Sequence, residues 1–96
     1  MKILILKKET TLFDIEGYAV FLPYEEGKFE ILNNHCSMIS MISYGILKIY
    51  SSFFIDKKLY HNNDVNISYI DNTTIIKIKI NYGYLNINNN RLTILI

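Results

Sequence analysis

Apolar and polar residues alternate along most of this chain with a period of two residues. Such alternation is typical of β-strands with one buried face, and helical periodicity is almost absent. Isoleucine, tyrosine, valine, phenylalanine and threonine dominate these runs, which is strand composition. The run from Ile3 to Leu6 is apolar on both faces, as expected for a strand inside a sandwich. The other apolar residues, grouped by the strand face they are predicted to share, are Tyr18, Val20 and Leu22; Val65, Ile67 and Tyr69; Ile76, Ile78, Ile80 and Tyr82; Leu85 and Ile87; Leu92 and Ile94.

Turn signals separate these runs at short intervals. Asparagine and aspartate tolerate positive φ values and hydrogen-bond to their own backbone, so clusters of them close hairpins. Gly45 and Gly83, each beside a tyrosine, mark strand starts where a bulge or a close backbone approach is expected. The segment from Asn34 to Ser43, the only candidate for a helical turn, is interpreted as extended. The predicted turns are Glu26–Lys28, Asn33–Asn34, Tyr44–Gly45, Asn62–Asp64, Asp71–Thr73 and Asn88–Asn90. Together these patterns predict a single all-β domain over residues 1–96, an antiparallel β-sandwich or flattened barrel.

Composition narrows the class of protein without identifying it. The chain has 96 residues, of which 50% are hydrophobic and 20% are charged, so it is not a disordered tail. Ten basic and nine acidic residues give a formal net charge of +1, which argues against a polybasic membrane anchor. One cysteine excludes a disulfide-stapled fold. No apolar run reaches the ~18 residues of a spanning helix, and Ile3–Leu6 is too short for a signal-peptide core.

The residues that could carry catalysis do not form a recognisable constellation. His35 and Cys36 are adjacent, so in a strand their side chains would point to opposite faces. We interpret Cys36 as a small buried apolar residue and His35 as a hydrogen-bonded surface or interface residue. Glu25 and Glu26 lie beside a predicted turn and are interpreted as a solvated tip. The four glycines are scattered singly, so no phosphate-binding loop is expected, and we predict no catalytic, cofactor or metal site.

A small OB-type barrel that binds single-stranded nucleic acid is an alternative that the residues leave open. Lys77 and Lys79, with Tyr82 and Tyr84, could form a basic and aromatic strand face that stacks bases. The near-neutral net charge instead favours an ordinary solvent-exposed face. Composition and spacing by themselves predict an all-β interaction domain and not an enzyme, with a generic protein-interaction module as a further alternative.

One longer segment is more specific than these patterns. Residues 22–35, Leu-Pro-Tyr-Glu-Glu-Gly-Lys-Phe-Glu-Ile-Leu-Asn-Asn-His, resemble the signature of the ATP synthase epsilon subunit. Thr11–Phe13 resembles the family's Leu-Phe opening, Gly45–Ile49 its Gly-x-Leu-x-Ile strand, and residues 83–95 its closing hairpin. The order and approximate spacing of these motifs agree from end to end, so the resemblance covers nearly the whole chain.

The chain also departs from the usual family pattern. Asn33 stands where the family usually has proline, and Cys36–Ser37 where it has Ala-Pro. The segment between Ile49 and Tyr82 is longer than in the common form, so its strand pairing is not predicted. The sequence ends at Ile96, without the family's C-terminal helical hairpin, and so it resembles the short members of the family.

The resemblance implies a function and two partner surfaces. It implies a sandwich of about ten strands in the central stalk of a proton-translocating ATP synthase, on the cytoplasmic face of a bacterial cell membrane. There the subunit would clamp the gamma subunit to the c ring and would itself be non-catalytic. The resemblance implies that it binds no cofactor, ATP or nucleic acid and does not insert into the membrane. The residues that match the c-ring turn are Glu25, Glu26, Gly27, Lys28 and Phe29, and those that match the segment packed toward gamma are Asn34, His35, Ser37 and Met38.

Overall fold

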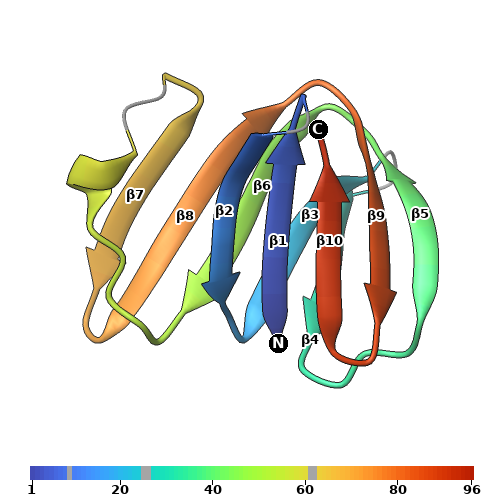
Figure 1. The fold of residues 1–96 in the computed structure, drawn as a ribbon, viewed down its shortest axis with the longest axis horizontal. Coiled ribbons are helices and arrows are strands. Elements are labelled where there is room, and N and C mark those ends of the chain that lie inside the picture. Colours follow the sequence, from blue (N-terminus) through green and yellow to red (C-terminus); the bar gives the residue numbers. More distant parts are fainter. Residues whose placement is uncertain (9, 25–26, 61–62) are drawn as a thin grey trace.

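The computed structural model describes residues 1–8, 10–24, 27–60 and 63–96, which form ten β-strands and one short 3₁₀ helix (Figure 1). The strands build two facing five-stranded sheets, so the predicted all-β sandwich of about ten strands is confirmed. The elements are β1 (Lys2–Lys7), β2 (Thr10–Glu16), β3 (Ala19–Tyr24), β4 (Gly27–Leu32), β5 (Met38–Ile42), β6 (Gly45–Ser51), η1 (Lys57–Leu59), β7 (Val65–Ile70), β8 (Thr73–Ile80), β9 (Gly83–Asn88) and β10 (Arg91–Leu95).

The strand order differs between the two sheets. The first sheet has the order β2-β1-β10-β9-β5 and the second has the order β4-β3-β6-β8-β7. Strand pairing is antiparallel except between β1 and β10, where Lys2 lies opposite Arg91 and Leu6 opposite Leu95 in a parallel register. The antiparallel prediction therefore holds with one exception, which joins the first and last strands side by side (Figure 1).

The core follows the predicted alternation along most strands. Ile76, Ile78 and Ile80 are at most 5% exposed, and Leu85, Ile87, Leu92 and Ile94 at most 2%. Tyr82 was predicted to continue the Ile76–Ile80 face, and this is wrong: its side chain is 68% exposed because β8 ends at Ile80. Tyr18 is also exposed, since β3 begins one residue later at Ala19.

Turns are confirmed around Asn34, Asp71 and Asn89, whereas Gly27 and Lys28, from the predicted turn Glu26–Lys28, belong to β4. Asn34, Asp71, Asn89 and Asn90 all have positive φ values, between 52° and 64°. Gly83 begins β9 where a Cβ atom would lie 2.5 Å from the backbone oxygen of Leu95, so the expected close approach is present. The extended interpretation of Asn34–Ser43 is confirmed for Met38–Ile42, which is a strand, but not for Asn34, which lies in a turn.

Residues 52–60, in the segment that is longer than the common family form, are tied to the second sheet by side-chain hydrogen bonds. The Phe53 N–H donates to the hydroxyl of the buried Ser51, the last residue of β6, at 3.1 Å. The buried Thr74 hydroxyl donates to the Phe53 carbonyl oxygen at 2.8 Å. The Tyr69 hydroxyl donates to the Ile55 carbonyl oxygen at 2.6 Å, and Asp56 caps the 3₁₀ helix by accepting from the Lys58 N–H.

Candidate partner-binding surfaces

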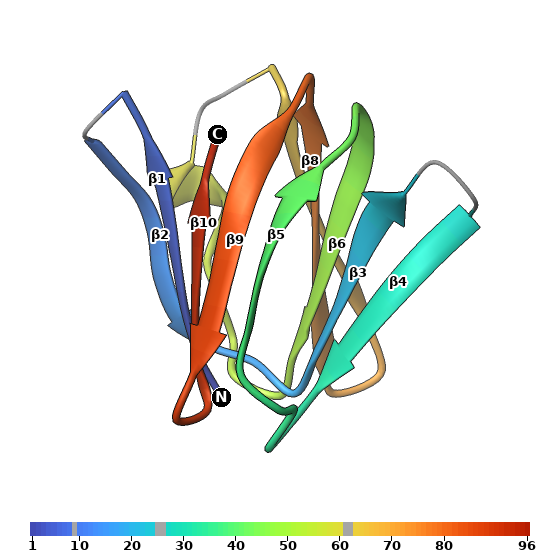
Figure 2. The same cartoon turned by 90° about the vertical axis from the view of Figure 1, so that its right-hand side faces the viewer.

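The five residues predicted to meet the c ring directly follow β3, which ends at Tyr24. Glu25 and Glu26 lie outside the described residues. Gly27, Lys28 and Phe29 belong to the first half of β4, where their backbone pairs with Tyr24, Pro23 and Leu22. The predicted turn is therefore shorter than expected, because Lys28 and Phe29 are strand residues. The end of β3 and the start of β4 lie at the same end of the sandwich as the β5–β6 and β8–β9 turns (Figure 2).

Of the residues predicted to face gamma, Asn34, His35 and Ser37 lie in the connection between β4 and β5, which is at the opposite end of the sandwich (Figure 2). The Asn34 N–H donates to the Asn90 side-chain oxygen at 2.8 Å, and the Ser37 hydroxyl donates to the Asn88 side-chain oxygen at 3.1 Å. These bonds fix the connection against the β9–β10 turn. Met38 begins β5 and is half-buried. The two predicted surfaces are therefore separated by the length of the sheets and do not form one site.

Cys36 is exposed, so its interpretation as a buried apolar residue is wrong. The prediction assumed a strand at this point, whereas β5 begins only at Met38 and Cys36 lies in the preceding loop. Half-buried His35 directs its Nδ1 atom to the Cys36 carbonyl oxygen at 2.8 Å. A carbonyl oxygen only accepts, so Nδ1–H is the donor. The hydrogen-bonded surface histidine that was expected is thus present.

An exposed apolar row that the sequence did not indicate crosses the outer face of the first sheet. Met41 lies opposite Tyr84, and Tyr84 lies opposite Leu95, across β5, β9 and β10. Their side chains are 64%, 49% and 48% exposed, and Ile39, two residues before Met41 on the same strand, is 80% exposed. Contiguous exposed apolar surface of this kind marks contact sites for other molecules. The row follows from strand register, which no local pattern specifies.

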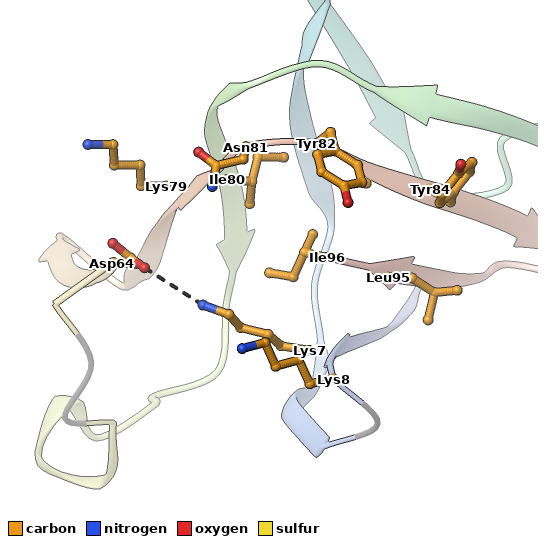
Figure 3. Close-up of a pocket in the computed structure, with 11 residues that line it drawn as sticks. Lys7, Lys8, Asp64, Lys79, Ile80, Asn81, Tyr82, Tyr84, Leu95 and Ile96 are labelled. Atoms are coloured by element: carbon orange, nitrogen blue, oxygen red, sulfur yellow. Dashed lines mark ion pairs between the residues drawn. The ribbon is translucent and has the colours of Figure 1, made fainter.

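A pocket of about 670 Å³ lies beside the β8–β9 turn (Figure 3). Lys7, Lys8 and Lys79 line it together with Tyr82 and Tyr84, and the Lys7 ammonium lies 3.8 Å from the Asp64 carboxylate. Three of the four residues considered for base stacking therefore meet here. The fourth, Lys77, is not in the pocket lining; it lies on β8 opposite Lys48 of β6. Amines and phenols of this kind can hold an anion.

Two further properties bear on what the described residues can do. Within residues 1–8, 10–24, 27–60 and 63–96, no helix has the length and apolar character needed to cross a membrane. In the same part of the chain, no three histidine, cysteine, aspartate or glutamate side chains gather as a metal site would require.

Residues 1–58 match the family model described as the ATP synthase delta/epsilon chain, beta-sandwich domain. The chain belongs to this family. The resemblance to the epsilon subunit is thereby confirmed. The residues of both predicted partner surfaces lie within the matched range 1–58. The alternative of an OB-type barrel is wrong, because the strands form two five-stranded sheets.

The comparisons with individual proteins support the fold but identify no relative that is similar in sequence. No curated protein matches the sequence. Among solved structures, the chain is similar to one in the cryo-EM structure of the Tetrahymena thermophila mitochondrial ATP synthase, central stalk and c ring, with a TM-score of 0.67 and 11% identity. The similarity covers 98% of this delta/epsilon-family chain but only 60% of the Tetrahymena chain.

Proposed function

We propose that this protein is a non-catalytic subunit of the central stalk of a proton-translocating ATP synthase, where it fixes the gamma subunit to the c ring. The observation that carries the proposal is the match of residues 1–58 to the delta/epsilon β-sandwich family. The fold supports it, since a similar sandwich occurs in the structure titled as a central stalk and c ring. The subunit would be peripheral to the membrane, held there by the complex.

The position of the two predicted surfaces fits a link between two partners. One surface lies where β4 begins and the other directly follows the end of β4. At roughly 3.3 Å per residue, the six residues of β4 place them about 20 Å apart. The strand between them is hydrogen-bonded to β3, and its inward-facing Ile31 is fully buried in the core. Because packed interiors are barely compressible, force applied at one end is transmitted to the other.

The gamma-facing surface is uncharged, which predicts how its binding responds to salt. Asn34, His35, Ser37 and Met38 carry no formal charge at pH 7 with His neutral, and the neighbouring Ile39 and Met41 are the most exposed apolar residues of β5. Interfaces with apolar cores lose little affinity when surface charges are screened. We therefore expect a one-to-one complex with gamma that survives moderate salt.

Co-purification with the gamma subunit encoded in the same genome tests the gamma contact. A stable complex at both 50 mM and 500 mM salt is expected, and Ser37→Arg is expected to weaken it by placing an unpaired charge in the contact. Asn72→Arg, which lies in the β7–β8 turn away from the β4–β5 connection, is the matched control. Absence of a complex, together with salt-sensitive binding to single-stranded DNA, would contradict the proposal.

The c-ring contact is tested by coupling. Replacing Glu25 and Glu26 with serines, in the connection between β3 and β4, is expected to preserve binding to gamma. It should weaken docking on the ring, so that ATP hydrolysis by the reconstituted enzyme proceeds with reduced proton pumping. Full coupling in this variant would show that the ring contacts a different part of the subunit.

Calorimetric titration with ATP is expected to show no saturable binding to the isolated chain.

A further inference from the structure

The four edge strands of the sandwich are not equally protected against pairing with another strand. The edges are β2 and β5 in the first sheet and β4 and β7 in the second. An edge strand presents backbone N–H and C=O groups to any extended chain, and charges, irregularities or covering loops normally blunt it. β2 carries exposed Asp14 and Glu16 and a register shift against β1. β4 carries the exposed Glu30, and the Tyr69 side chain of β7 is hydrogen-bonded to the Ile55 carbonyl oxygen.

In the part of the chain that the structure describes, β5 has none of these protections. Its sequence, Met-Ile-Ser-Met-Ile, contains no charge and no proline, and its register with β9 runs without a shift from Met38 to Ile42. The lack of charge extends well beyond the strand, since no lysine, arginine, aspartate or glutamate occurs between Glu30 and Lys48. Figure 2 looks onto this side of the sandwich, where β5 is the last strand of its sheet.

Both faces of β5 offer apolar contact beside the edge. On the outer face, Ile39 is 80% exposed and Met41 is 64% exposed. Toward the second sheet, β5 borders a pocket of about 180 Å³ lined by Leu22, Pro23, Met38, Ser40, Met41, Ile42 and Leu85. A cavity of about 150 Å³ admits a benzene-sized group, so this one has room for an aliphatic or aromatic side chain.

We propose that the β5 edge binds an extended, uncharged segment of the gamma subunit by β-strand addition. The segment would extend the first sheet by one strand, with its backbone paired to β5. Its side chains would alternate between the exposed Ile39–Met41 surface and the pocket beside Leu22 and Pro23. In this mode of recognition the backbone supplies affinity and the alternate side chains supply specificity.

The chemistry of the edge decides which segment it binds. A lysine or carboxylate brought against this strand would be partly desolvated, and neither β5 nor the rest of residues 31–47 carries a charge to offset that cost. A segment with apolar or hydroxyl side chains carries no charge and therefore does not incur this desolvation cost. The inference rests on the proposed function only in naming gamma as the source of the segment.

A charge placed on the edge tests the inference in the whole 96-residue chain. Ile39→Lys puts a lysine on β5 at a side chain that is already 80% exposed, so folding is expected to be unaffected. The matched control is Ile70→Lys, at a 59% exposed position on the opposite edge strand β7. By calorimetry with purified gamma, Ile39→Lys is expected to weaken binding tenfold or more. Ile70→Lys is expected to change it less than twofold.

Hydrogen exchange gives a second readout that a lost side-chain contact alone would not produce. Amides of Met38–Ile42 that exchange in the isolated chain are expected to become protected in the complex. Gamma binding by the wild-type chain without this protection, or unchanged by Ile39→Lys, overturns strand addition and leaves the proposed function standing. Failure of the wild-type chain to bind gamma overturns both. A homodimer that Ile39→Lys dissociates, with gamma binding intact, assigns the edge to a second copy and also overturns the proposal.

Discussion

Lys48 and Lys77 lie directly opposite each other on β6 and β8, in the interior of the second sheet. Like charges in this relationship repel, and each such pair is destabilising relative to a neutral one. The β7 residue opposite Lys77 is Asn66, which brings no compensating charge. The outer face of this sheet is therefore basic at its centre, although the whole chain has a formal net charge of only +1.

Replacing Lys77 with glutamate should stabilise the fold, because it converts a like-charge pair into an opposite-charge pair. The expected gain in the free energy of unfolding is about 0.2 to 1 kcal/mol, decreasing at high salt. Urea unfolding at low and high salt measures it. The control is the double variant Lys48→Glu/Lys77→Glu, which restores a like-charge pair at the same two positions. A gain in the double variant equal to that of Lys77→Glu would mean that cross-strand repulsion is not the cause.

Replacing Gly83 with alanine should destabilise the protein. The added Cβ atom would meet the Leu95 backbone oxygen at 2.5 Å and the Ile96 Cγ2 atom at 3.0 Å, and a backbone oxygen within a sheet cannot simply rotate away. Overpacking of this kind costs about 1 to 3 kcal/mol. Thermal unfolding compared with Asn86→Ala, an exposed position on the same strand, provides the measurement. Equal melting temperatures for the two variants would contradict the close approach.

Thr74 and Thr73 provide a matched test of the hydrogen bonds that hold the loop after β6. Thr74→Val should lower the free energy of unfolding by about 1 to 3 kcal/mol, because the Phe53 carbonyl oxygen loses its donor. Thr73→Val should change it by less than about 0.5 kcal/mol, since the Thr73 hydroxyl makes only a 3.4 Å contact with the Tyr18 hydroxyl. Denaturant titration separates the two, and an equal effect would show that the loop bond contributes nothing.

Cys36 should react with a thiol reagent in the native protein, because its side chain is exposed. One equivalent of thiol is expected to titrate without denaturant, and Cys36→Ser is expected to give none. Under the proposed function, the same reaction should slow when gamma is bound, since Cys36 lies between His35 and Ser37 of the predicted gamma surface. Reaction only after unfolding would contradict the exposed position.

The sequence predicted the strands and turns because these depend on neighbouring residues. Alternation located the buried faces around Ile76–Ile80 and Leu85–Ile87, and asparagine clusters located turns at Asn34 and Asn89. The epsilon-type motifs predicted the family, since they combine many weak local signals in a fixed order. Local reasoning failed at Tyr82 and Cys36, where a strand ended earlier or began later than the pattern suggested.

Only the tertiary structure decided how these elements are combined. Pairing of β1 with β10 joins residues about ninety positions apart, and the Met41–Tyr84–Leu95 row depends on the register of three strands. The pocket at Lys7 and Lys79 and the unprotected edge of β5 depend on which strands become neighbours or edges. Alternation fixes which side of a strand is apolar, but pairing depends on contacts between distant segments. The individual strands could therefore be predicted from the sequence, whereas the surfaces they form together required the folded molecule.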